Sequence, residues 1–232
     1  MKRPLRILHL EDDPKDSELI RESLEADGSA HFRAPAGKVL YFQALDENHN
    51  EIQRMRSVVQ LQAGEKRSCI GCHENRMLAP PSPDRIPTAM CREPQALEAP
   101  FWGAGPFSYQ NVVQPVWNAK CIQCHDARDE DRIDLTETVD AEGIPASYRT
   151  VITKGWVHYF DYTWGQEHAK AEPLTFGTVK SRLWEILDDG HYDVHLTRDE
   201  AHRIKCWTDL NCPLWSDYVF RPKRLTAKTT TP

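Results

Sequence analysis

The sequence lacks several features, and each absence argues against a class of function. It contains no apolar run close to the roughly 18 residues of a membrane-spanning helix, so we expect no span of a bilayer. It has no excess of basic residues, because Lys and Arg total 29 against 35 for Asp and Glu, a net charge of −6. Nucleic acid is therefore not expected as the main partner. Regular internal repeats are also missing.

Glycine is scarce, and the rest of the composition is that of a soluble globular protein. There are 11 glycines against 16 prolines, together with seven tryptophans, which predicts long ordered loops around aromatic contacts. With 232 residues, 40% hydrophobic and 28% charged, the chain is long enough to form a core in one large or two small domains.

The seven cysteines point to a cofactor rather than to disulfides, since an odd number leaves one over. Two segments, 69–73 and 121–125, each read Cys-x-x-Cys-His, the attachment sequence of c-type haem. Two thiols at this spacing add to the two vinyl groups of one porphyrin, and the next residue places an imidazole beneath the iron. The pattern predicts two covalently attached haem c groups, held by Cys69, Cys72, His73, Cys121, Cys124 and His125.

Two other chemistries compete for these cysteines. Two Cys-x-x-Cys pairs could bind a tetrahedral zinc ion, but zinc ribbons separate their pairs by about 15 to 20 residues. Here 48 residues lie between Cys72 and Cys121, and each pair is followed by histidine. The other alternative is disulfide formation. Haem is the preferred interpretation.

A histidine loop in the C-terminal third supplies candidates for the second axial position of the second haem. His191 and His195 lie between two predicted helices, which would hold a ring steady at coordination distance. His191 is favoured, because His195 could merely lead into the cap of the next helix. His158 and His168 are weaker candidates. The competing interpretation is that these are solvated loop histidines.

For the first haem no nearby histidine is evident. Met77, Met90 or a tyrosine could approach the iron, or the position could be open, which would permit chemistry. We expect His9, His31 and His49 to be structural or exposed.

The remaining cysteines leave alternatives open. Cys206 and Cys212 could pair in an oxidising compartment, although an intact helix would hold them too far apart. Cys91 is then the odd thiol, and all three could equally be unpaired.

The opening segment resembles the start of a bacterial response-regulator receiver domain. Residues 6–10 suit a buried strand, the acidic 11–13 follow, and a helix is expected from Pro14 to a stop at Gly28. The resemblance covers only residues 5–28. The phosphorylatable aspartate and later lysine of a receiver have no counterpart, so residues 1–30 are interpreted as a receiver-like β-α fragment without signalling function.

The later elements predict an α+β fold. Residues 39–45 and an extended stretch to Leu61 form a β-hairpin signal around a polar turn. Residues 79–106, with seven prolines, are an expected extended connector, and Ser108 caps an expected helix running into Cys121. Two more helices are expected, at 178–189 and from the capping box at Thr197 through Leu210.

These elements suggest four segments. After the fragment at 1–30 come a small β-rich domain with the first haem motif at 35–100 and a mainly helical cytochrome c-like domain with the second at 101–222. Residues 223–232 are a Lys/Thr-rich tail that we expect to be disordered.

Several motifs follow one another in order along the chain, which are Pro35-Ala36-Gly37 with Leu40-Tyr41-Phe42-Gln43, Met55-Arg56-Ser57, Gly64-Glu65, both haem motifs, Val113-Gln114-Pro115-Val116, Gly190-His191-Tyr192-Asp193-Val194 and Cys206-Trp207-Thr208-Asp209-Leu210-Asn211. On these motifs, residues 35–222 resemble the C-terminal part of planctomycete proteins related to the hydrazine synthase alpha subunit.

The resemblance implies a domain order and a ligand set. In such proteins a β-propeller precedes a middle domain with one haem and a helical domain with a second, histidine-ligated haem. Carried over, His73 and His125 are proximal ligands and His191 is the distal ligand of the second haem. Here a propeller and a signal peptide are not visible, although haem chemistry and family both predict a location outside the cytoplasm, in the periplasm or its equivalent.

The sequence therefore predicts a dihaem c-type cytochrome module for electron transfer, or part of a redox enzyme. Its expected partners are redox proteins and the missing propeller domain or subunits. The alternative is a haem enzyme acting on a small nitrogen or oxygen compound at an open first haem. Zinc-binding and signalling roles are weaker alternatives.

Overall fold

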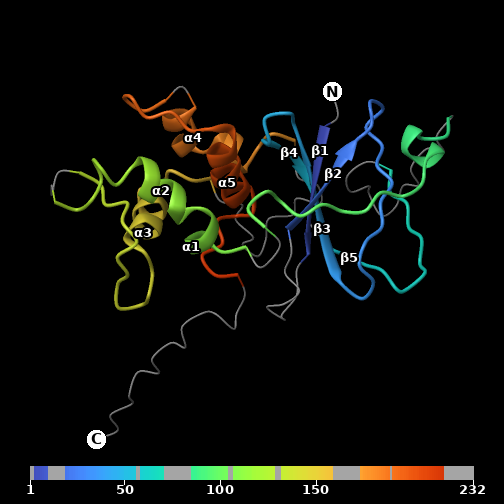
Figure 1. The fold of residues 1–232 in the computed structure, drawn as a ribbon, viewed down its shortest axis with the longest axis horizontal. Helices are drawn as coiled ribbons and strands as arrows, with labels where there is room; N and C mark the ends of the chain where they lie inside the picture. Colours follow the sequence, from blue (N-terminus) through green and yellow to red (C-terminus); the bar gives the residue numbers. More distant parts are fainter. Residues whose placement is uncertain are drawn as a thin grey trace, which may run out of the picture.

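The structure is a computed structural model that describes most of the chain. The described residues are 3–9, 19–55, 58–70, 85–103, 107–128, 132–158, 173–188 and 190–216. Among them, no helix has the length and apolar character needed to span a membrane. The sheet lies on one side of the molecule and the five α-helices lie on the other (Figure 1). This arrangement confirms a mixed α+β fold.

An antiparallel sheet forms from strands between residues 3 and 60. Its strand order is β2-β1-β3-β4, and β5 pairs with β3 beside β4. The strands are β1 (Arg3–His9), β2 (Leu19–Leu24), β3 (Val39–Leu45), β4 (Glu51–Arg54) and β5 (Val59–Gln60).

The helix predicted for the receiver-like segment is wrong where the structure describes it. A strand forms near 6–10 as expected, but the predicted helix is replaced at Leu19–Leu24 by strand β2, which pairs antiparallel with β1. The apolar residues that suggested a helical stripe lie instead in a strand whose backbone groups bond to a neighbouring strand, so tertiary pairing overrides a weak helical preference. The expected start at Pro14 lies outside the described residues.

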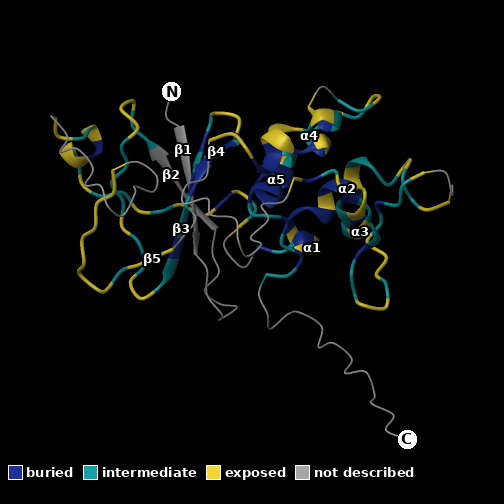
Figure 2. Cartoon of the chain, turned by 180° about the vertical axis from the view of Figure 1, so that it is seen from behind, coloured by how far each residue is buried: buried dark blue, intermediate teal, exposed yellow. Residues whose placement is uncertain are grey.

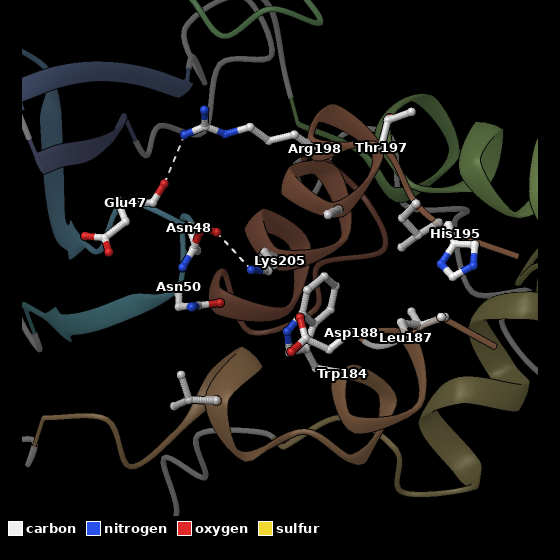
Figure 3. A pocket seen from close by; sticks show the side chains of 14 residues that line it. Glu47, Asn48, Asn50, Trp184, Leu187, Asp188, His195, Thr197, Arg198 and Lys205 are labelled. Carbon is white, nitrogen blue, oxygen red and sulfur yellow. Dashed lines mark hydrogen bonds between the residues drawn. The ribbon is translucent and has the colours of Figure 1, made fainter. Parts of the chain in front are cut away.

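The predicted hairpin is confirmed. The turn between β3 and β4 is closed by Asp46, whose Oδ1 accepts from the backbone N–H of Asn48 and of Asn50 at 2.9 and 2.8 Å. His49 adopts a positive φ of 63°, which the tight turn requires. The turn therefore projects residues 46–50 toward the helical side of the molecule (Figure 3).

The helical part follows the expected order with two adjustments. Its elements are η1 (Thr88–Cys91), α1 (Tyr109–Val112), α2 (Gln114–Lys120), α3 (Ala146–Thr153), η2 (Gly177–Lys180), α4 (Arg182–Leu187) and α5 (Arg198–Asp209). Ser108 caps α1 as predicted, and Pro115 is accommodated in the first turn of α2. The helix expected at 178–189 is instead a 3-10 turn and a short α-helix, because Ser181 is extended between them.

Two of these helices show which helix starts the sequence could predict and which it could not. The capping box of α5 is present, since the Thr197 side chain accepts from Glu200 N while Glu200 Oε2 accepts from Thr197 N. Helix α3 was not predicted. It has no side-chain cap at Pro145, so it carries no strong start signal.

A single apolar cluster joins the helices. Tyr109, Trp117 and Trp207 are its largest fully buried members. The Tyr109 ring lies 5.1 Å from that of Trp207, and Trp117 Nε1 donates to Tyr109 Oη at 2.7 Å. Buried residues are concentrated in α1, α2 and α5 and in the strands facing them (Figure 2).

A buried polar network connects the sheet to the helices. Arg54 Nε donates to Glu51 Oε1 at 2.5 Å, and Gln43 Nε2 donates both to Glu51 and to the backbone carbonyl of Asp209. Burial lowers the pKa of Arg54, but nearby Glu51 outweighs this effect and the pKa is raised. Every partner is hydrogen-bonded, which is what makes charged groups tolerable inside a protein.

Candidate haem site

The second Cys-x-x-Cys-His motif begins where helix α2 ends. The N–H of Cys121 donates to the carbonyl of Trp117 at 2.8 Å and closes the helix. Cys124 N and His125 N then both donate to the Cys121 carbonyl, at 3.1 and 3.0 Å. The chain continues in helical turns, so Cys121, Cys124 and His125 lie at i, i+3 and i+4 and share one face.

The two thiols differ in exposure. Cys121 is half-buried and Cys124 is exposed. Burial, followed by nearby Glu200 and Cys124, raises the pKa of the Cys121 thiol to about 11.

His191 lies in a tight turn between α4 and α5. His191 N donates to the Val194 carbonyl and Val194 N donates to the His191 carbonyl, both at 3.0 Å. Gly190, with a φ of +86°, begins the turn. A Cβ at Gly190 would lie 2.5 Å from Cε1 of His195, so the ring of His195 packs against this glycine.

The structure brings His191 and His125 together. Their ring centres are 6.1 Å apart, and their planes differ by 26°. Burial, and after it the neighbouring His191, lowers the pKa of His125, while the backbone of Ile133 has the opposite effect. His125 Nδ1 is buried without a hydrogen-bond partner of good geometry among the described residues.

These residues fit a haem. Two imidazole nitrogens bound on opposite sides of one metal ion would lie about 4 Å apart, because each metal–nitrogen distance is about 2 Å. Each ring centre lies about 1 Å beyond its nitrogen, so the ring centres would be about 6 Å apart. The His125–His191 separation of 6.1 Å agrees with this value, and two thiols at the required spacing lie on the same helical turns. Within the described ranges no three His, Cys, Asp or Glu side chains gather to hold a bare ion.

The other candidate histidines are not at this position. His195 and His158 are exposed, and His168 lies outside the described residues. His49 is buried and stacks on His202, with ring centres 3.8 Å apart and planes within 5°. His202 was not singled out from the sequence, and this stack joins the β3–β4 turn to α5.

The first motif is described only in part. Cys69 is exposed in an extended stretch, whereas Cys72, His73 and Met77 lie outside the described residues. Met90 is 57% exposed in η1. Attachment of the first haem and its axial ligand therefore stay predictions.

The remaining cysteines differ in exposure. Cys91 is exposed, and Cys206 and Cys212 are both buried. Helix α5 continues past Cys206 to Asp209, as the objection to a disulfide anticipated. Burial raises the pKa of Cys212 well above its usual range.

A buried polar network around Gln114 connects helix α2 to the loop that follows the second motif. Gln114, 2% exposed, accepts from Ser147 Oγ at 2.5 Å and donates to the Leu135 carbonyl at 3.2 Å. Leu135 N in turn donates to the His125 carbonyl at 3.0 Å. Gln114 thus connects α2 to the loop that follows His125. The sequence analysis did not assign a role to Gln114. The signal that could have done so is a glutamine among apolar helix positions.

Comparison with known proteins agrees with this architecture. The sequence model of a family described as "Hydrazine synthase alpha subunit middle domain" matches residues 15–74, which include the first motif and begin upstream of residue 35. This segment is therefore related to that domain. No curated protein matches the chain in sequence.

One solved structure shares the fold. It is titled "Kuenenia stuttgartiensis Hydrazine Synthase" and has 14% sequence identity and a TM-score of 0.63. The similarity covers 91% of this chain and 38% of the solved chain. The present chain therefore spans well under half the length of that protein.

Proposed function

We propose that this chain is a dihaem c-type cytochrome module that transfers electrons, alone or within a larger redox enzyme. Cys121, Cys124 and His125 would hold the second haem, with His191 on its other axial position. Cys69, Cys72 and His73 would hold the first. The relation of residues 15–74 to a hydrazine synthase domain supports a role as part of a redox enzyme.

The observation that carries the proposal is the His125–His191 pair. The two residues come from different elements, one after α2 and the other between α4 and α5, yet their ring centres are 6.1 Å apart. Each is fixed by backbone hydrogen bonds on its own side, so the spacing does not depend on a direct contact between the rings.

A bound haem supplies one-electron chemistry, with a potential set by axial ligands, burial and nearby charge. The residues of this chain determine those conditions. His125 and His191 would fill both axial positions, which favours electron transfer over binding of a small molecule at the second haem. A catalytic role would fall to the first haem.

The proposal extends to partners and location. Redox proteins and further subunits or a propeller domain would be the partners, since the solved chain of similar fold is much longer than this one. Haem attachment to Cys-x-x-Cys-His takes place where cytochrome maturation operates, so we propose an extracytoplasmic location.

Expression with an added export signal, in a strain competent for cytochrome maturation, tests cofactor and ligation together. We expect two haems per chain by pyridine haemochrome assay and a low-spin spectrum for the second haem in both redox states. Purified protein with no Soret band and with stoichiometric zinc would overturn the proposal.

A further inference from the structure

A groove of about 800 Å³ opens between the β3–β4 turn, α4 and α5 (Figure 3). This size is within the range of small-molecule sites, about 300–1,000 Å³. The proposed haem ligands do not line it. Its walls include Asn48 and Asn50 from the turn, Trp184 and Leu187 from α4, and Ala201 and Lys205 from α5.

The helix spacing explains how the walls form. Thr197, Ala201 and Lys205 follow one another at intervals of four residues, so they lie in a row along one face of α5. Ala201, in the middle of this row, has a small side chain, so it leaves space for the groove. Asp188 stands four residues after Trp184 and belongs to the facing wall.

Lys205 is a buried ammonium with spare hydrogen-bonding capacity. The residue is only 5% exposed, and Nζ donates to the Asn48 carbonyl at 2.8 Å and lies 4.2 Å from the centre of the Trp184 ring. An ammonium has three N–H donors, and the Asn48 carbonyl accepts from one of them. Burial lowers the pKa of Lys205, although Asp46 and Asp188 oppose this effect.

Asn50 presents the complementary group in the same groove. Its Nδ2 donates to Asp46 Oδ2 at 2.8 Å, which fixes the orientation of the amide. Its Oδ1 is buried and accepts no hydrogen bond from the described residues. Figure 3 shows Asn50, Lys205, Trp184 and Asp188 gathered at one end of the groove, away from His195. A donor with spare capacity and an acceptor with no partner among the described residues therefore belong to the lining of one groove.

The charge of the lining narrows the chemical class of the ligand. Glu47 and Asp188 balance Arg198 and Lys205, so the four formal charges sum to zero. A polyphosphate would meet two carboxylates and no net positive charge. A molecule that carries one positive and one negative group next to an apolar part fits better.

We propose that this groove binds a free α-amino acid with an apolar side chain. Lys205 donates to the carboxylate of the ligand, Asn50 Oδ1 accepts from its ammonium group, and Trp184 and Leu187 contact its side chain. This site does not rest on the proposed haem function.

Isothermal titration of the full-length chain with L-leucine, leucinamide and N-acetyl-leucine tests the proposal. L-Leucine should bind saturably, and each analogue, which lacks one of the two charged groups, should bind at least about tenfold more weakly. Equal binding of all three would mean that only the apolar part is recognised. That result, or no saturable binding of L-leucine up to about 10 mM, would overturn the proposal.

A pair of variants locates the site. Lys205→Met keeps the length of the side chain and removes its donors, so L-leucine affinity should fall at least about tenfold. Lys154→Met, at an exposed position after α3 and outside the groove, is the matched control and should bind as the unaltered chain does. Unchanged affinity in a folded Lys205→Met chain would refute the site. If that variant does not fold, the analogue series on the unaltered chain decides.

Discussion

The ring centres of His125 and His191 lie 6.1 Å apart, although one residue follows α2 and the other precedes α5. Two independent backbone arrangements produce this distance. The helical turns after Cys121 place His125, and the reciprocal hydrogen bonds between His191 and Val194 place His191. A pair at this separation is suited to share one metal centre.

His191→Ala should open the sixth position of the second haem. Loss of the imidazole ligand should make that iron partly high-spin and able to bind carbon monoxide, and should shift its potential. Absorption spectra with and without carbon monoxide measure both effects.

His195→Ala is the matched control, because His195 is exposed and its ring packs against Gly190. It should leave the low-spin spectrum nearly unchanged. If His195→Ala converts the spectrum and His191→Ala does not, the ligand assignment is wrong.

Each haem should depend on its own pair of cysteines, because thioether attachment is local to each motif. Replacing Cys69 and Cys72 with alanine should leave one haem per chain by pyridine haemochrome assay, held at Cys121 and Cys124. A loss of both haems, or of neither, would contradict independent attachment.

The local signals in the sequence predicted the surroundings of the second motif well. The Ser108 cap, the capping box at Thr197 and the Asp46 turn each depend on residues within four positions of one another. These signals are local, and so is the Cys-x-x-Cys-His spacing.

Features that depend on distant pairing were not predicted. Leu19–Leu24 is a strand because β1 pairs with it, and the sequence of the segment itself does not indicate this pairing. The stack of His49 on His202, and the groove between the β3–β4 turn, α4 and α5, exist only once the sheet has packed against the helices. The sequence favoured His191 over His195 because His195 could merely lead into the cap at Thr197. The distance of 6.1 Å between the ring centres of His125 and His191 depends on the packing of distant segments, which the sequence does not show.

Gln114→Leu should loosen the loop behind His125. The change removes the acceptor of Ser147 and the donor to the Leu135 carbonyl, both buried, so we expect a loss of about 2 kcal/mol in the free energy of unfolding. Urea unfolding measures it. The exposed Gln110→Leu on α1 is the control and should change stability by less than about 0.5 kcal/mol. Equal effects would mean that the network does not stabilise the loop.

Asp140 should make the loop before α3 sensitive to acid. Hydrogen bonds from the backbone of Ile144, and also from Arg149 and the backbone of Glu142, lower the pKa of this carboxyl below its usual 3.8. A lowered folded-state pKa contributes stability above the ordinary value, and this is lost as pH falls through the lowered one. The difference in urea midpoint between the unaltered chain and Asp140→Asn should therefore shrink from about pH 5 to about pH 2. A constant difference would rule out titration of Asp140 as its source.

A comparison of Gly177→Ala with Gly155→Ala should separate two costs of an added Cβ at the junction of sheet and helices. One is the clash with a neighbouring side chain, and the other is the left-handed backbone. Gly177 and Gly155 both have a φ of +64°, so alanine at either position costs about 1 kcal/mol through the left-handed backbone. A Cβ at Gly155 meets nothing within 4 Å, whereas at Gly177 it would lie 2.5 Å from Oδ1 of the fully buried Asp209, which accepts from Thr178 N. Gly177→Ala should therefore lower the free energy of unfolding by about 1–3 kcal/mol more than Gly155→Ala does. Equal losses in urea unfolding would show that Asp209 can move aside, and that the close approach of η2 to the end of α5 does not determine how the two parts pack.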